Sequence, residues 1–233
     1  MRLFWVNRGT GLCFRQLGRL GRPAYFAIVG TLFFNFIYYC GPTDVHAGLL
    51  IEPFAGYAFN GEVEEKFVSG GDTYKWEYTG TAYGMRAGLS FGPFLLGGQG
   101  NLVQETWKGK DPKTTFINDS DQKMSGQNYG AFIGISLPVL RFWGTYLFYN
   151  KYKKDDDNGL FCNGDAFMGN GIVAGVGIAP IPFFSINFEY RTFNLNLVDI
   201  KVENKRYKLD NGREVKKKEF LVSLSLPLSL GGK

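Results

Sequence analysis

The chain has 233 residues, which is long enough for one substantial domain. Its mean hydropathy is close to zero, and this excludes a polytopic helical membrane protein. Aromatic residues make up 17% of the chain and glycine occurs 32 times, both high proportions for a soluble domain. The formal charge of +5 is uneven, because five arginines lie within the first 22 residues. Without that segment the basic and acidic residues nearly balance, so the charge indicates targeting rather than nucleic-acid binding.

Residues 1–47 have the pattern of a secretory signal peptide. A basic segment precedes an apolar run over 24–39, and Val45-His46-Ala47 forms an A-x-A-like cleavage site. The apolar run is shorter than the ~20 residues that span a bilayer comfortably, and Asn35 interrupts it. We therefore predict a cleaved leader over 1–47 and one mature domain over 48–233. A retained helical anchor is the alternative.

Cysteine is almost absent from the predicted mature domain. Cys13 and Cys40 belong to the leader, which leaves Cys162 alone. A single thiol cannot form an internal disulfide. The chain also lacks the CxxC or Cys/His spacing of a typical metal site, so we expect neither a metal nor a cofactor.

A strand rhythm runs through the mature domain. Eight stretches of about ten residues alternate apolar with small or polar side chains, and their connections are alternately short and long. The short connections are Gly92-Pro93, Pro138-Val139 and 180–182. The long connections are predicted near 60–78, 107–127, 150–167 and 193–216. This pattern predicts an all-β fold, an eight-stranded antiparallel up-and-down transmembrane β-barrel.

The first four predicted strands carry polar or charged side chains on one face only. In the first strand, 49–59, Ile51 and Tyr57 share a face and Glu52 lies on the other. Because a carboxylate in hydrocarbon is costly, the face of Glu52 is predicted to be the lumen. The strands 79–91, 94–107 and 129–137 then send inward, among others, Arg86, Gln99, Asn101, Glu105 and Phe132.

The last four predicted strands follow the same alternation. The fifth strand, 140–150, is apolar on both faces, and we expect its inward residues to be Arg141, Trp143, Thr145 and Tyr149. The sixth, 168–178, turns inward the glycines 169, 171, 175 and 177. The seventh, 184–191, turns inward Ser185, Asn187, Glu189 and Arg191, and the eighth, 219–228, turns inward Glu219, Leu221, Ser223 and Ser225.

Proline placement supports one orientation of the barrel. Prolines gather in the short connections, where strand pairing stops and a missing donor does no harm. Both ends of the mature chain lie on this side, which is therefore predicted to be periplasmic, with the four long loops extracellular. A soluble lipocalin-like barrel is the structural alternative. It would have to put the rows of Phe, Tyr, Ile and Leu inside and the charged strand residues in water.

Three segments resemble the small eight-stranded outer-membrane proteins of bacteria, the OmpA/OmpX-like or OmpW-like group. They are the opening LLIEPFAGYAF, the strand FSINFEYR and the closing FLVSLSLPL. The resemblance covers about 48–228 and rests on pattern rather than on a sharp motif. It implies the barrel fold and an outer-membrane location. The chain departs from the group at its end, which is Leu-Gly-Gly-Lys rather than the aromatic residue that the barrel assembly machinery commonly reads.

The inward polar residues are the candidate functional site. They are predicted to form a lumen network with a structural or gating role, made up of Glu52, Arg86, Gln99, Asn187, Glu189 and Arg191, with Asn101 nearby. One interpretation is a polar plug in which each buried charge needs a partner. The other is a gate or ion-selective constriction. The strand-six glycines are expected to make room for Trp143 and Tyr149.

The residues of the chain do not indicate a catalytic function. The one histidine, His46, lies in the predicted leader, so a Ser/His/Asp arrangement is not available and we expect no enzyme. The DDDNG run at 155–159 lacks the alternating ligand spacing of an EF-hand loop, and we predict a solvated loop there. Lys216–Lys218 are expected to meet lipopolysaccharide phosphates electrostatically.

The sequence thus predicts a structural or interaction barrel of the outer membrane with a side-chain-filled lumen. Its expected partners are outer-membrane lipid and lipopolysaccharide, the barrel assembly machinery and a surface partner of the long loops, and no nucleic acid. The alternative is a narrow pore or an OmpW-like channel for small or apolar solutes. A lipid A-modifying enzyme is a third hypothesis, which the missing histidine disfavours.

Overall fold

The computed structural model describes residues 47–67, 73–110, 121–156, 163–181, 183–200, 205–209 and 213–230. The predicted leader apart from Ala47, and Cys162, lie outside these ranges. None of the described residues belongs to a helix long and apolar enough to cross a membrane.

Ten antiparallel strands make up the described part. They are β1 (Ala47–Phe67), β2 (Thr73–Phe91), β3 (Phe94–Gly109), β4 (Gln122–Ser136), β5 (Leu140–Lys154), β6 (Ala166–Ile181), β7 (Phe184–Ile200), β8 (Lys205–Lys208), β9 (Arg213–Ser225) and β10 (Leu228–Leu230).

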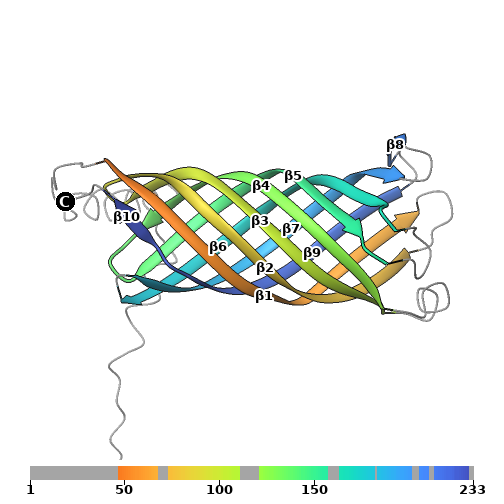
Figure 1. Ribbon diagram of the computed structural model, residues 1–233, viewed down its shortest axis with the longest axis horizontal. Coiled ribbons are helices and arrows are strands. Elements are labelled where there is room, and N and C mark those ends of the chain that lie inside the picture. Colours follow the sequence, from red (N-terminus) through yellow and green to blue (C-terminus); the bar gives the residue numbers. More distant parts are fainter. Residues whose placement is uncertain are drawn as a thin grey trace, which may run out of the picture. The chain divides into compact units, whose positions relative to one another are not determined.

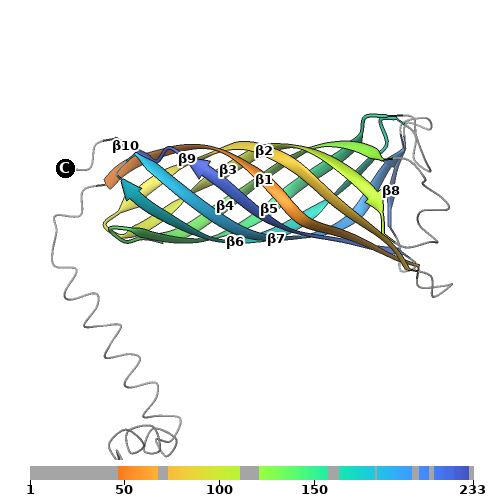
Figure 2. The same cartoon turned by 90° about the horizontal axis from the view of Figure 1, so that it is seen from below.

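Eight of these strands close into a ring. Each of β1 to β7 pairs with the next in the chain, and β9 pairs with both β7 and β1. The short β10 pairs with the start of β1, and β8 pairs with the end of β7. The strands tilt around a common axis (Figure 1 and Figure 2), as closure of a barrel requires. The predicted eight-stranded transmembrane barrel is confirmed.

The barrel has two unlike ends. We call the end with the short connections β2–β3, β4–β5 and β6–β7 the turn end; β1 begins there and β10 lies beside it. The opposite end is the loop end. The strands run further toward the loop end than predicted, since β1 ends at Phe67 and β2 begins at Thr73. Most of the predicted loop 60–78 is therefore strand, because pairs such as Val63 with Trp76 continue the ladder beneath a charged outer face.

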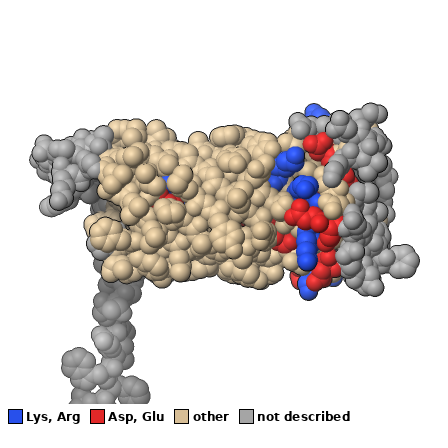
Figure 3. Space-filling view, viewed as in Figure 1, with Lys and Arg blue, Asp and Glu red and all other residues tan. Residues whose placement is uncertain are grey.

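The outer face is apolar over most of the barrel's length. Exposed side chains such as Ile133 at 66% and Leu102 at 58% point away from the lumen. The predicted lipid-facing row of the last strand is exposed at Phe220, Leu224, Leu226 and Leu228 and half-buried at Val222. Charged residues gather at the loop end, as Figure 3 shows on one face of the molecule. An apolar exterior around a polar interior is the inverse of a soluble barrel, and it defines a membrane-spanning one.

β-Bulges reverse the faces of three strands, β1, β5 and β7, and in β7 the reversal leaves both Leu195 and Val198 buried. Asn60 has φ 51°, and the pairing of β1 with β2 shifts between Ala58 and Gly61, so Val63 rather than Glu62 faces the lumen. In β5, Tyr129 pairs with Tyr149 and the next pair is Gly130 with Leu147, which leaves Phe148 as the extra residue.

The second bulge corrects one prediction. Tyr149 shares the outer face with its partner Tyr129, and their ring centroids lie 5.9 Å apart. The prediction that Tyr149 faces the lumen is therefore wrong, and Leu147, which is fully buried, faces inward instead.

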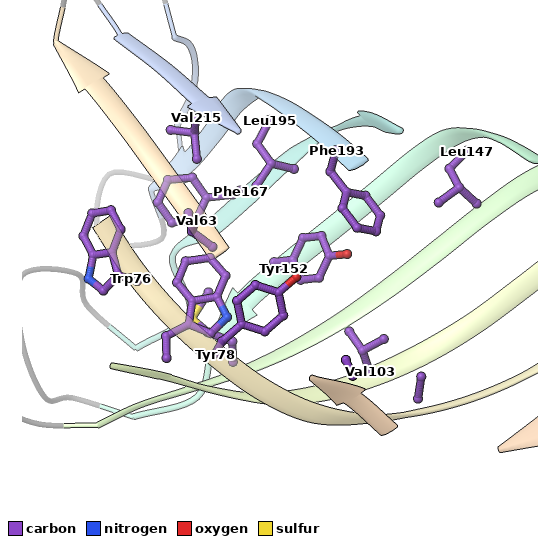
Figure 4. Close-up of a cluster of buried hydrophobic side chains, with 14 of the residues drawn as sticks. Val63, Trp76, Tyr78, Val103, Leu147, Tyr152, Phe167, Phe193, Leu195 and Val215 are labelled. Carbon is purple, nitrogen blue, oxygen red and sulfur yellow. The ribbon is translucent and has the colours of Figure 1, made fainter. Parts of the chain in front are cut away.

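The interior is packed differently along its length. Near the loop end a large cluster of buried side chains fills the lumen (Figure 4). We call it the loop-end core, and its larger members include Trp76, Tyr78, Trp107, Tyr152, Phe167, Phe193, Leu195 and Val215. Toward the turn end the buried apolar residues are the small group Leu50, Leu95 and Phe132. Polar and charged residues lie between these two clusters.

Candidate functional site: a chain of ion pairs in the lumen

Eight charged side chains form one continuous chain of ion pairs inside the barrel. Positive and negative groups alternate along it in the order Arg141, Glu52, Arg86, Glu189, Arg191, Glu219, Lys217 and Glu105. We call this set the ion chain. It carries four positive and four negative groups, so it is neutral as a whole. Its members come from β1, β2, β3, β5, β7 and β9.

The ion chain begins at Arg141, which pairs with Glu52. Arg141 donates from Nη1 to Oε2 of Glu52 at 2.7 Å, and Arg86 Nη1 lies 3.0 Å from Oε1. Ser225 donates its hydroxyl to the same Oε1 at 2.6 Å. Glu52 therefore has three partners, and this offsets the cost of burying its carboxylate.

Glu189 and Arg191 form the middle of the ion chain. Arg86 donates from Nη2 to Glu189 Oε1 at 2.7 Å. Arg191 contacts Glu189 Oε2 through Nε at 2.8 Å and through Nη2 at 2.7 Å. Arg191 also reaches Glu219 Oε1 through Nη1 at 3.4 Å. Because residues two apart in a strand share a face, Glu189 and Arg191 of β7 can pair directly.

Lys217 joins the last two carboxylates. Its Nζ donates to Glu219 Oε2 and to Glu105 Oε1, each at 2.8 Å. Trp107 Nε1 donates to the other oxygen of Glu105 at 2.8 Å, and the Tyr78 hydroxyl donates to Glu219 Oε2 at 2.8 Å. These two aromatic donors link the ion chain to the loop-end core.

Aromatic rings surround two of the four cations. The Arg86 guanidinium lies 4.3 Å from the ring centroid of Trp143 and 4.9 Å from that of Phe54. Lys217 Nζ lies 4.3 to 4.6 Å from the ring centroids of Tyr78, Tyr152 and Phe193, which come from three different strands (Figure 4). Such contacts stabilise a desolvated cation.

Glycines let the rings come this close. A side chain at Gly175 would occupy the place of the Trp143 indole, and one at Gly61 would occupy the ring of Tyr78. The small residues of β6 therefore make room for Trp143, as predicted, but not for Tyr149, which lies outside.

The six predicted site residues fall into two groups. Glu52, Arg86, Glu189 and Arg191 lie together in the ion chain. Asn187 donates to Ser225 at 2.9 Å and so contacts the ion chain through a partner of Glu52.

Gln99 is buried, pairs in register with Arg86 of the ion chain and accepts a hydrogen bond from Thr145 at 3.1 Å. The charges at Arg141, Glu105 and Glu219 were predicted to face inward but were not assigned to the network.

The position of Lys217 was predicted wrongly. The triplet 216–218 was expected to face the lipopolysaccharide phosphates, yet Lys217 is fully buried in the lumen. Its neighbour Lys216 is exposed and lies 2.9 Å from Glu214. The alternation of β9 back from the inward Glu219 would have identified Lys217 as inward.

The outer charges of the loop end form mixed pairs. Lys110 Nζ lies 2.7 Å from Glu62 and 2.8 Å from Glu77, and these hydrogen bonds raise the pKa of Lys110 above its ordinary value. In the predicted solvated loop, Asp156 accepts a hydrogen bond from the Lys123 amide at 2.7 Å. Residues 157–159 of the DDDNG run lie outside the described ranges. The described residues contain no cluster of three metal-ligating side chains.

Comparison with known proteins finds resemblances among solved structures. No protein-family model matches the chain, and no curated protein matches it. Among solved structures it resembles the Neisserial surface protein A, with 14% identity, a TM-score of 0.45 and coverage of 77% of this chain and 97% of that one.

Two further solved structures resemble the chain. The attachment invasion locus protein Ail of Yersinia pestis, solved with the heparin analogue sucrose octasulfate, gives 14% identity, a TM-score of 0.46 and coverage of 78% and 99%. The outer-membrane protease OmpT of Escherichia coli gives 11%, 0.35, 82% and 98%. The structures that the chain resembles are thus a surface protein, an attachment and invasion protein and a protease.

Proposed function

We propose that the protein is a structural or interaction barrel of the outer membrane whose lumen does not conduct. The observation that carries this proposal is the ion chain, which is continuous from Arg141 to Glu105 and whose members are all at most 9% exposed. An eight-stranded barrel is just wide enough for its side chains to fill it. The side chains of the ion chain and of the loop-end core together fill the lumen.

The energetics of the ion chain favour a plug over a gate. Opening a path would separate pairs such as Lys217 with Glu105, and each separated charge would remain in a lumen lined by aromatic rings. Breaking one buried pair typically costs about 3–5 kcal/mol. Glu52, Glu189 and Glu219 are each shared by two ion pairs, so movement of one side chain would disturb its neighbours as well.

The orientation follows from the two ends. In this proposal residues 1–47 are a leader removed on export, the turn end faces the periplasm, and the loop end faces outward. The barrel assembly machinery would insert the mature chain. Exposed lysines at the loop end would lie level with lipopolysaccharide phosphates. These lysines include Lys66, Lys75, Lys108, Lys110 and Lys216.

A second candidate, a narrow pore, is favoured by one observation. Asn101, Asn128 and Asn150 are register neighbours on β3, β4 and β5, and all three are buried. Within the described ranges, neither amide atom of Asn101 or of Asn128 has a hydrogen-bond partner. Buried amides of this kind are commonly satisfied by water, and a hydrated row is where a pore would begin.

A lipid A-modifying enzyme is the third hypothesis. We propose that the barrel does not have this activity. The chain's one histidine belongs to the predicted leader, so a histidine base would be missing from the mature barrel. Mass analysis of lipid A from cells with and without the barrel tests this. An acyl or phosphate change that depends on the barrel would contradict the proposal.

Solute uptake separates the plug from the pore. Residues 48–233 are refolded, shown to be heat-modifiable on gels and reconstituted into liposomes for swelling assays with small sugars and amino acids. We expect swelling no faster than in empty liposomes. Reproducible swelling that disappears when Asn128 is replaced by Leu would identify the pore instead.

A further inference from the structure

The turn end contains a hollow that the ion chain does not fill. It has a volume of about 450 Å³ and lies among the short connections, the start of β1 and the start of β10. Its walls include Leu50, Leu95, Leu137 and Val139, with the hydroxyls of Ser136 and Ser229. We call it the turn-end cup. Its volume falls within the roughly 300–1,000 Å³ of small-molecule sites.

One charged side chain lines the turn-end cup, and it is Arg141. Arg141 is 9% exposed and terminates the ion chain. Among the described residues, its one ion-pair partner is Glu52, which it contacts through Nη1 alone. By contrast, Arg86 and Arg191 each contact two carboxylates.

The Arg141 guanidinium therefore has spare donors. A guanidinium carries five N–H groups, and Nε of Arg141 is buried without a hydrogen-bond partner in the described part of the chain. Glu52 divides its charge between Arg141 and Arg86. Because the ion chain alternates and ends on Arg141, its terminal charge at the turn end is positive, and the shared Glu52 compensates that charge only in part. No described residue lining the cup carries a carboxylate to balance it.

We propose that the turn-end cup binds a medium-chain aliphatic carboxylate. The carboxylate would take the spare donors of Arg141, since guanidinium and carboxylate match in a two-bond geometry. The alkyl chain would lie against Leu50 and Leu95, which pack with Phe132. Val139 and Ile181, which are both more than half exposed, add apolar surface for the alkyl chain, and this favours an aliphatic chain over a peptide C-terminus. The site lies at the opposite end from the loops, so it is independent of the function proposed above.

A binding experiment with labelled octanoate tests the site. Carboxyl-¹³C octanoate is titrated into the refolded barrel in lipid nanodiscs, and the signal of empty nanodiscs is subtracted. We expect saturable binding of one octanoate per barrel. We also expect 1-octanol to bind at least about tenfold more weakly, because it lacks the charge-assisted hydrogen bonds. No saturable binding, or equal affinity for acid and alcohol, would overturn the proposal.

Three variants locate the binding site. Arg141→Gln should weaken octanoate binding at least about tenfold while leaving octanol unchanged. Ser136→Trp fills the cup beside Arg141, its partner in register, and should abolish binding of both ligands. Lys108→Gln, which removes an exposed charge at the loop end, should bind like the wild type. Octanoate binding that survives Ser136→Trp in a heat-modifiable barrel would show that the cup is not the site.

A peptide C-terminus is the other ligand that could supply a carboxylate, and a short apolar peptide with a free C-terminal carboxylate tests it. We expect it to bind more weakly than octanoate. Tighter binding of the peptide would overturn the assignment to an aliphatic ligand.

Discussion

The two ends of the lumen are packed differently around a buried cation. At the loop end, Lys217 has two carboxylates and three aromatic rings around it, and the core beyond it is continuous. At the turn end, Arg141 has one carboxylate and a hollow beside it. The same ring of eight strands is therefore closed at one end and open at the other. Residue choice on the inner face, rather than strand number, sets this difference.

The comparison predicts that the loop-end cation contributes most to stability. Lys217→Met would leave Glu105 and Glu219 buried without their ammonium partner, so we expect a loss of about 3–5 kcal/mol in the free energy of unfolding. Urea titration of the barrel in lipid vesicles measures it. Lys216→Met on the outer face is the matched control and should change stability by less than about 0.5 kcal/mol. Equal effects of the two variants would mean that Lys217 is not in the lumen.

The loop-end core should be nearly as sensitive. Phe193→Ala removes a fully buried ring that packs edge-to-face on Tyr152, with centroids 5.7 Å apart. We expect a loss of about 3 kcal/mol, because the closed end cannot collapse around the cavity. The same urea titration checks it, and a loss below about 1 kcal/mol would indicate that this end is loosely packed.

A truncation beside the turn-end cup should cost less. Leu95 is buried next to Leu50, but it also borders the hollow. We expect Leu95→Ala to lower the free energy of unfolding by about 2 kcal/mol, at the low end for a buried leucine, because water already reaches the site. A loss larger than that of Phe193→Ala would reverse the order of the two ends.

The terminal cation should matter least. Arg141→Gln removes one of three partners of Glu52, while Arg86 and Ser225 remain. We expect a loss of about 1.5 kcal/mol, the low end for a hydrogen bond to a charged group, because Glu52 keeps two partners. If the urea titration instead gives a loss equal to that of Lys217→Met, the ion chain would be equally tight at both ends, and Arg141 would have no donors to spare.

Most of the fold could be predicted from period-two alternation, because one face of each strand must meet lipid. Rows such as Ser185, Asn187, Glu189 and Arg191 on β7 show this clearly. The bulge at Phe148 could not be found in this way, since β5 is apolar on both faces and either assignment of Tyr149 fits the pattern. The length of the strands was also missed, because charges on an outer face above the membrane resemble a loop.

The residues that form the candidate site could be predicted better than the contacts between them. Glu52 and Arg86 are directly paired in register, but Lys217 meets Glu105 across the lumen, and no single-strand pattern contains that contact. The order of the ion chain depends on strand register and tilt around the whole ring. For the same reason the turn-end cup, which is lined by three connections and the starts of β1 and β10, could not be predicted from the sequence.

Single-channel conductance of residues 48–233 in planar bilayers tests the closed lumen most directly. The protein should first be shown to be folded by its heat-modifiable migration on gels. We predict a silent bilayer at all applied voltages, for the wild type and for Arg141→Gln alike, because the loop-end core closes the lumen regardless of the turn end. Reproducible current steps from the folded wild-type barrel would contradict the account.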